Sequence, residues 1–195
     1  MQTETRAKDT AGKREAILDA ALELFAERGF HGTPVPLVAE RAGVGAGTIY
    51  RYFESKEALV NALYQSWKTK LGAALMEDFP FDRPVREQFH VYWERMVRFV
   101  RQHPRAFAFL ELHHHAPYLD DTSRAIEAQL LQVASDFLEQ TAKQQVTKAL
   151  PPALLMAIVF GAFAQLIKAS WLSEITLTDE IMDAAEACCW EAIRR

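Results

Sequence analysis

The sequence predicts an all-α fold. Apolar residues recur at helical spacing along most of its 195 residues, and no polar and apolar alternation is long enough for a strand. Proline and glycine fall mainly between the periodic segments, where they begin or end helices. Half of the residues are hydrophobic, so the chain can bury a core without disulfide or metal staples.

Each expected helix has a boundary signal of its own. Gly29 stops the first helix, Ser55 is placed to cap the fourth, and Pro84 and Pro104 suit first turns. Thr178 precedes Asp179 and Glu180 at the start of the last helix, where acids suit the helix dipole. The expected helices span about 13–28, 34–41, 46–52, 56–76, 84–102, 104–116, 151–172 and 178–195. A further helix reaches about Lys143 from a cap offered by Asp120, Asp121, Thr122 or Ser123.

Charge and cysteine content narrow the function classes. The formal net charge of -4 means that nucleic-acid binding must be local. Cys188 and Cys189 are adjacent and cannot join distant segments, so nothing indicates an oxidising compartment. The N-terminus lacks a signal-peptide core, and the apolar stretch 153–167 is interrupted by Gln165 and Lys168. We expect a cytoplasmic protein without a membrane partner.

The segment 33–59 predicts a helix-turn-helix. Thr33 is expected to cap the second helix with Pro34 at its first position. Gly43 ends that helix in a left-handed conformation, and Val44 plugs the turn into the core. Ile49 and Phe53, four residues apart, would hold the third helix against the body.

The third helix is the predicted DNA reader because no acidic residue lies between Val44 and Phe53. Ser55 and Lys56 are expected to reach phosphate at the start of the next helix. Double-stranded DNA is thus the predicted partner of one set of residues, which comprises Thr33, Ala46, Gly47, Thr48, Tyr50, Arg51, Tyr52 and Lys56.

This segment resembles the TetR family of bacterial regulators, whose N-terminal domain shows an AxxLF helix followed by T…xxxAxxAGVxxGTxYxYFxxKExL. The matching residues are Ala21, Leu24, Phe25, Thr33, Ala39, Ala42, Gly43, Val44, Gly47, Thr48, Tyr50, Tyr52, Phe53, Lys56, Glu57 and Leu59. The resemblance covers about residues 13–62. It implies an arm and DNA-binding domain over 1–54 and a ligand-binding and dimerisation domain over 55–195, sharing helix 56–76 as a connector.

Three departures from the family pattern weaken direct base reading. Gly45 stands where a capping serine is frequent, Ala46 where a polar or basic residue often reaches bases, and Pro36 with Leu37 replaces a polar pair. We expect DNA shape and the N-terminal arm with Arg6 and Lys8 to contribute more of the discrimination.

Large rings on several helices suggest a pocket for a small hydrophobic or aromatic effector, although each ring alone is more often plain core. We expect the strongest contributions from Tyr64, Trp93 and Phe163. The full predicted pocket set is Tyr64, Trp67, Phe89, Trp93, Met96, Phe107, His114, Phe137, Phe160 and Phe163.

The run from Glu111 to Asp120 contains His113, His114 and His115, which invites a metal site. Consecutive histidines on a helix point in different directions, so a structural or pocket role is favoured and we expect no metal or cofactor. A metal-dependent enzyme using this cluster stays the alternative from another class, beside a DNA-binding protein that needs no ligand.

The last two helices predict a dimer interface, with a buried core helix in a monomer as the alternative. The predicted contact residues are Leu155, Ile158, Val159, Leu166, Ile181, Ala185, Cys188, Cys189 and Ala192. By the resemblance, the protein is a homodimeric repressor rather than an enzyme. Its effector would tilt the helix after Ser55 and so separate the two reading helices.

Overall fold

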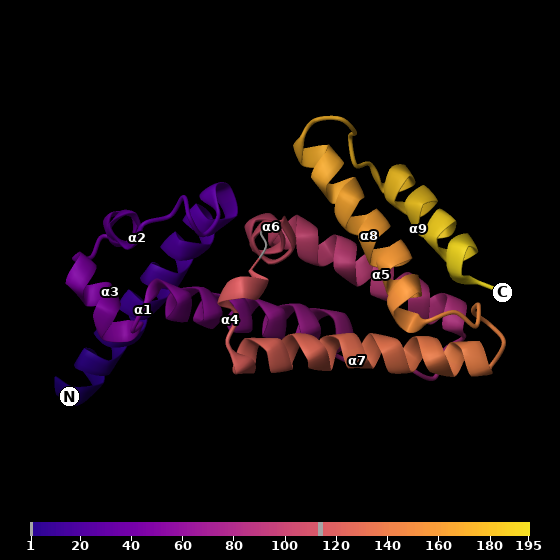
Figure 1. Cartoon of the computed structure of the whole chain (residues 1–195), viewed down its shortest axis with the longest axis horizontal. Coiled ribbons are helices and arrows are strands. Elements are labelled where there is room, and N and C mark those ends of the chain that lie inside the picture. Colours follow the sequence, from indigo (N-terminus) through magenta and orange to yellow (C-terminus); the bar gives the residue numbers. More distant parts are fainter. Residues whose placement is uncertain (1, 113–114) are drawn as a thin grey trace. The chain divides into compact units, whose positions relative to one another are not determined.

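Helices account for nearly all the regular structure, as the sequence predicted. The computed structural model describes residues 2–112 and 115–195, with side chains described for 12–111, 115 and 117–195. Arg6, Lys8 and His114 therefore lie outside the described side chains. Within the described residues, nine α-helices and a short 3-10 helix follow one another, and no strands form (Figure 1).

The helix bounds agree closely with the boundary signals. The helices are α1 (Gln2–Arg28), α2 (Val35–Arg41), α3 (Ala46–Tyr52), α4 (Lys56–Met76), α5 (Val85–Gln102), α6 (Pro104–Leu112), η1 (Ala116–Tyr118), α7 (Asp121–Lys143), α8 (Pro152–Trp171) and α9 (Asp179–Ile193). Only α1 departs strongly, because it begins at Gln2 and not near residue 13. The expected arm is helical since this stretch contains no proline to stop a helix.

The chain divides into two compact units, each built from two stretches of sequence. The first unit comprises Met1–Leu71 and Val100–Ile126, and the second comprises Gly72–Phe99 and Glu127–Arg195. Helices α4, α5 and α7 each pass from one unit into the other.

The first unit has its core between α1 and α6. Ile17, Leu24 and Phe25 of α1 are fully buried, and the Phe25 ring lies 6.2 Å from that of Phe109 on α6, centroid to centroid. These apolar contacts give the short α2 and α3 a rigid support.

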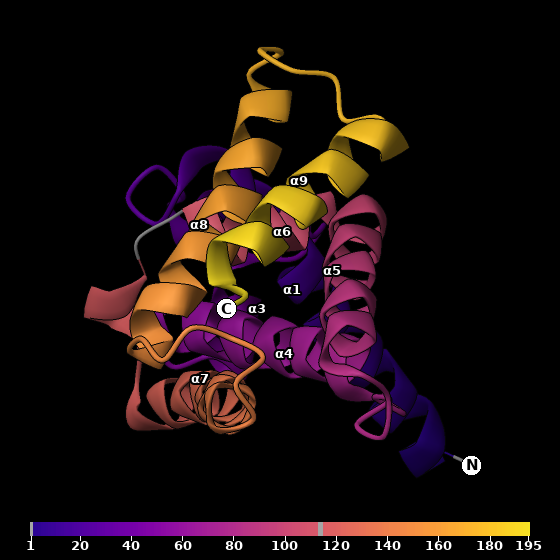
Figure 2. The ribbon, with the colours of Figure 1, turned by 90° about the vertical axis from the view of Figure 1, so that its right-hand side faces the viewer.

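The second unit is centred on α5, α8 and α9, and α8 and α9 pack directly against each other (Figure 2). Trp93 of α5 meets Phe163 of α8 edge to face at 5.2 Å, and Phe89 lies 5.4 Å from Trp190 of α9. The buried carboxylate of Glu186 accepts from Arg86 at 2.5 Å and contacts His90 at 3.2 Å. Aromatic packing and one buried ion pair therefore join α5 to α9.

Helix α8 is the one helix of the described chain that is long and apolar enough to cross a membrane by length and composition, which alone is weak evidence. Only 22% of its apolar window is buried inside the chain. Much of its apolar surface is thus left for another contact.

Candidate nucleic-acid interface

A glycine corner joins α2 to α3. Gly43 adopts a φ of +66°, and its N–H donates to Glu40 O while the N–H of Val44 donates to Ala39 O. This is a Schellman ending, which satisfies the last carbonyls of α2 and needs a residue that tolerates positive φ. The predicted corner is confirmed.

The turn before α2 differs from the prediction in one respect. Pro34, and not Thr33, is the N-cap of α2, and no side chain caps it. The Thr33 hydroxyl is fully buried and lies 2.8 Å from Gly29 O and 3.1 Å from Leu24 O, to which it donates. Gly29 ends α1 with a positive φ. The Thr33 side chain therefore belongs to the support of α2 and not to an exposed face.

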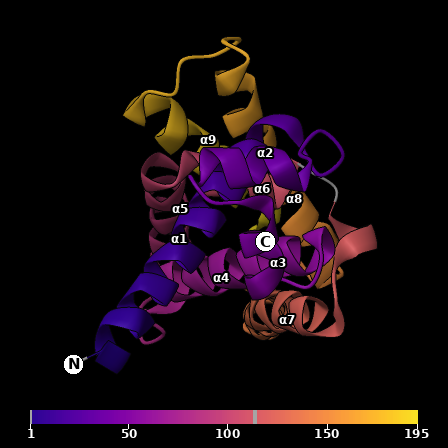
Figure 3. The ribbon, with the colours of Figure 1, turned by 90° about the vertical axis from the view of Figure 1, so that its left-hand side faces the viewer.

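Helix α3 (Figure 3), here called the reading helix, is anchored by two buried apolar residues at and near its end. Ile49 and Phe53 are buried as predicted, and the Arg14 guanidinium lies 5.4 Å from the Phe53 ring centroid. Tyr50 is 55% exposed, and Arg51 is exposed beside it. The other predicted contact residues of this helix also reach the surface, with Ala46 and Gly47 exposed and Thr48 and Tyr52 half-buried.

The charges around the reading helix differ in their availability. Arg41 of α2 pairs with Glu23 of α1 at 2.7 Å, and Arg105 of α6 lies 3.7 Å from the same carboxylate. The Arg41 hydrogen bond lowers the pKa of Glu23. Arg41 is thus already neutralised by a partner, whereas no ion pair is recorded for Arg51 among the described residues.

The start of α4 confirms one prediction and departs from another. Ser55 caps the helix as predicted, since its Oγ accepts from the Ala58 N–H at 3.1 Å. Lys56 turns back to the α1–α2 turn, where its ammonium donates to Phe30 O and lies 4.1 Å from the Phe30 ring centroid. Burial lowers the pKa of Lys56. The main contact of Lys56 is therefore intramolecular.

The predicted pocket residues fall in both compact units. In the first unit, Tyr64 and Phe107 are buried and Trp67 is half-buried. In the second unit, Phe89, Trp93, Met96 and Phe163 are buried, while Phe137 and Phe160 are half-buried. The buried indole N–H of Trp93 has no hydrogen-bond partner among the described residues, which is costly for a polar group.

The described part of the histidine run shows a structural contact. The His115 ring is buried, and its Nε2 lies 2.5 Å from Phe109 O. Among the described residues, no group of three His, Cys, Asp or Glu is placed to hold a metal ion. His113 and His114 lie outside the described residues, so their predicted roles stay predictions.

The predicted dimer residues divide between two faces of the terminal helices. Leu155, Val159 and Cys189 are buried inside the chain, because they follow the stripe that packs α8 and α9 together. That burial removes them from the predicted contact face. The others, Ile158, Leu166, Ile181, Ala185, Cys188 and Ala192, are half-buried or exposed.

The outer face of α8 contains residues that sequence reasoning missed. Leu154 is 46% exposed, and Gly161 and Ala162 are exposed seven and eight residues later on the same face. A Cβ built at Gly161 would meet nothing within 4 Å. The helical period alone could have placed Leu154 and Gly161 on the side of α8 opposite Phe163.

Comparisons with known proteins agree with this geometry. Residues 17–63 match the family model described as "Bacterial regulatory proteins, tetR family", and residues 64–195 match "Tetracyclin repressor-like, C-terminal domain". The HTH-type transcriptional regulator RutR of Escherichia coli K12 is 30% identical over 189 residues, covering 92% of this chain and 87% of RutR.

Two solved structures extend the comparison. A TetR family transcription regulator from Marinobacter aquaeolei VT8 gives a TM-score of 0.82 at 26% identity, covering 97% of this chain and 98% of its own. The transcriptional regulator FadR from Bacillus subtilis, solved in complex with stearoyl-CoA, gives 0.71 at 23% identity, covering 91% and 95%. At 23% identity the likeness to FadR is one of fold.

Proposed function

Because this chain belongs to the TetR family and is a DNA-binding transcriptional regulator, we propose that it is a cytoplasmic homodimeric repressor released from its operator by a small hydrophobic effector. The observation that carries the proposal is the reading helix. Two buried residues anchor it, while Tyr50 and Arg51 stand in solvent without an acidic neighbour on the helix.

The DNA contacts are proposed to come from the exposed face of α3. Arg51 would supply the charge-assisted contact, and Thr48 and Tyr50 would add polar and apolar contacts to phosphates and base edges. Ala46 and Gly47 let the DNA approach closely because they add almost no side chain. Lys56 would support this face indirectly, because its ammonium is bound to Phe30 in the turn before α2.

A second copy of the chain is the proposed occupant of the outer face of α8 and the adjoining surface of α9. A seven-residue reading helix makes few contacts alone, and two copies on a two-fold operator double them. The exposed apolar surface around Leu154 and Gly161 would be covered by the same surface of a second copy, as in a two-fold interface.

The effector is proposed to bind in the second unit near Trp93. Its unpartnered indole N–H would donate to an acceptor on the ligand, and the rings of Phe89 and Phe163 would cover apolar parts. FadR, which shares the fold, binds a molecule with a long apolar chain and carbonyl acceptors. Ligand and DNA would then oppose each other by linkage.

The test begins with selection of duplexes by the purified protein from a random-sequence library. We expect enrichment of a two-fold symmetric site with half-sites about 10 bp apart or a multiple of it. Binding of the enriched duplex is then followed by fluorescence anisotropy during titration with a panel of hydrophobic carboxylates, esters and aromatic compounds.

Release by at least one compound supports the repressor mechanism, and the same compound should lose its effect in Trp93→Phe. Enrichment without release by any compound would favour a DNA-binding protein that needs no ligand. Failure to enrich any duplex at low salt would contradict DNA reading by α3.

A further inference from the structure

The η1 segment after α6 is fastened to the turn before α2. The Tyr118 ring stacks on the Phe30 ring with centroids 3.9 Å apart and planes 16° from parallel. The Tyr118 hydroxyl lies 2.7 Å from His31 Nε2, across 87 residues of sequence. A tyrosine thus holds the α1–α2 turn by both its ring and its hydroxyl.

The same turn is held from the start of α4. Lys56 donates to Phe30 O and lies over the Phe30 ring, so that Phe30 contacts both Lys56 and Tyr118. The Phe25 ring is stacked 6.3 Å away from Phe30. Phe30 is therefore the point where α1, α4 and η1 meet.

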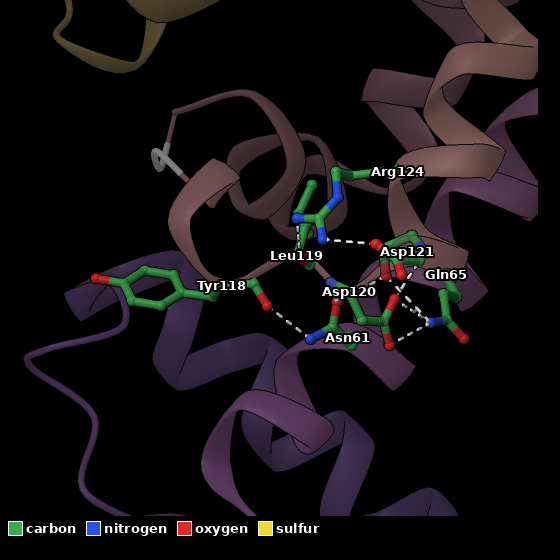
Figure 4. A network of polar contacts seen from close by, with 8 residues as sticks. Asn61, Gln65, Tyr118, Leu119, Asp120, Asp121 and Arg124 are labelled. Atoms are coloured by element: carbon green, nitrogen blue, oxygen red, sulfur yellow. Dashed lines mark hydrogen bonds and ion pairs between the residues drawn. The ribbon is translucent and has the colours of Figure 1, made fainter.

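A buried amide fastens η1 to α4 as well (Figure 4). Asn61 Nδ2 donates to Tyr118 O at 2.8 Å and to Glu57 O at 2.9 Å. Asn61 Oδ1 accepts from the Asp120 N–H at 2.9 Å and from Ser123 Oγ at 2.7 Å. All four hydrogen-bonding positions of the amide are thereby used.

The start of α7 completes the network. Asp120 caps α7, since its Oδ1 accepts from the Ser123 N–H at 2.7 Å, and Gln65 donates to the same carboxylate at 3.2 Å. Asn61 and Gln65 are one turn apart on α4, so the segment 118–123 lies along the first half of that helix.

We propose that Tyr118 and Asn61 are positioning residues for DNA binding. The α2–α3 hairpin enters from the turn that contains Phe30 and leaves into the helix that contains Lys56 and Asn61. Tyr118 ties these two ends together, so the reading helix is held in its DNA-binding orientation before DNA arrives. Preorganisation of this kind improves affinity by lowering the ordering cost of binding.

The exposure of Tyr118 and His31 separates the positioning role from core packing. Tyr118 is only half-buried and His31 is exposed, so removal of their contact opens no closed cavity. Neither residue is placed to touch DNA in the proposed function, on which this inference rests. Their contribution must therefore pass through the turn and α4.

The experiment compares Tyr118→Ala and Tyr118→Phe with wild type and with Phe81→Ala. Phe81 is a matched aromatic control because it is 65% exposed and lies in the second unit. The first readout is affinity for the duplex that wild type selects from a random library. The second is amide hydrogen exchange over 35–52, which requires no DNA.

We expect Tyr118→Ala to bind about tenfold more weakly and to exchange about tenfold faster over 35–52. Tyr118→Phe keeps the ring stacking and should stay within about threefold of wild type, and Phe81→Ala should match wild type. Asn61→Asp, which sets a carboxylate oxygen against two carbonyls, should weaken binding at least as much as Tyr118→Ala.

Equal affinity and equal exchange for Tyr118→Ala and wild type would overturn the inference. If wild type selects no duplex, the proposed function fails and exchange alone decides the positioning role. If Tyr118→Ala does not fold, His31→Ala removes the hydrogen bond together with the edge-to-face ring contacts that His31 makes with Phe30 and Tyr118. Unchanged exchange over 35–52 in that variant would overturn the inference.

Discussion

The reading helix α3 and the next-to-last helix α8 both leave large side chains in solvent, but the side chains differ in character. On α3 the exposed residues are Tyr50 and Arg51, held up by the buried Ile49. On α8 they include Leu154, beside the bare backbone of Gly161. The first surface suits a polyanion and the second suits an apolar copy of itself. Exposure therefore indicates a partner only when its chemistry is considered.

The largest expected effect comes from placing a charge on the α8 face. Gly161→Arg fits the single chain, because a Cβ there meets nothing within 4 Å. In a dimer it would set two guanidinium groups against an apolar partner, so we expect monomers and a loss of operator affinity of about a hundredfold or more. Light scattering after gel filtration measures the mass, and fluorescence anisotropy measures binding.

Ala128→Arg is the matched control, since Ala128 is exposed on α7 in the same unit. It should leave mass and affinity unchanged. A Gly161→Arg protein that keeps the dimer mass would show that the interface lies elsewhere.

The second-largest expected effect tests the exposed surface of α3. Arg51→Ala should weaken operator binding by about 10- to 100-fold, because it removes the one exposed cation of α3. The dimer mass should not change. Arg98→Ala, an exposed arginine of α5, provides the control. Undiminished affinity of Arg51→Ala at physiological salt would rule out Arg51 as a reader.

A smaller effect concerns the corner that presents α3. Gly43→Ala should lower the free energy of unfolding by about 1 kcal/mol, since alanine is strained at a φ of +66°. Gly12→Ala, in open space on α1, should raise it by about 0.5–1 kcal/mol. Urea denaturation of both variants measures the contrast, and equal shifts of the same sign would contradict it.

The smallest expected effect is a pH dependence of the hydrogen bonds around Asp120 in the first unit. The backbone hydrogen bond from Ser123 lowers the pKa of Asp120 below its ordinary 3.8. The ionised Asp120 carboxylate stabilises the folded state fully above pH 3.8. This stabilisation is lost as the pH falls through the lowered pKa of the folded state. The protection of the amides at the start of α7 against hydrogen exchange, corrected for the intrinsic exchange rate at each pH, should therefore fall in acid, and Asp120→Asn should remove most of that dependence.

Local signals made most of the fold predictable. Gly29, Gly43 and Ser55 end or cap helices through contacts within four residues, so their sequence context was sufficient. The neighbouring sequence does not show which residue far along the chain a side chain will contact. The Lys56 ammonium meets Phe30, 26 residues away, where a phosphate contact had been predicted.

The candidate site, too, was predictable only where its residues make local contacts. Helical period identified Ile49 and Phe53 as the anchors of α3 and Arg51 as an exposed residue. Thr33 was assigned to a cap because threonine favours that position, but burial of its hydroxyl against the carbonyls of Leu24 and Gly29 depends on the packed turn. Tyr118 carried no sequence signal because its partners are far along the chain.

The division of the first unit into two stretches of chain bears on how such regulators can be recombined. Phe25 of α1 packs on Phe109 of α6, which the gene encodes 84 codons later. A chimaera that exchanges only the first 54 or 63 residues would set one protein's α1 against another's α6 and leave Tyr118 without its own Phe30. A graft that transfers operator choice intact must carry 100–126 together with 1–71, as two insertions rather than one crossover.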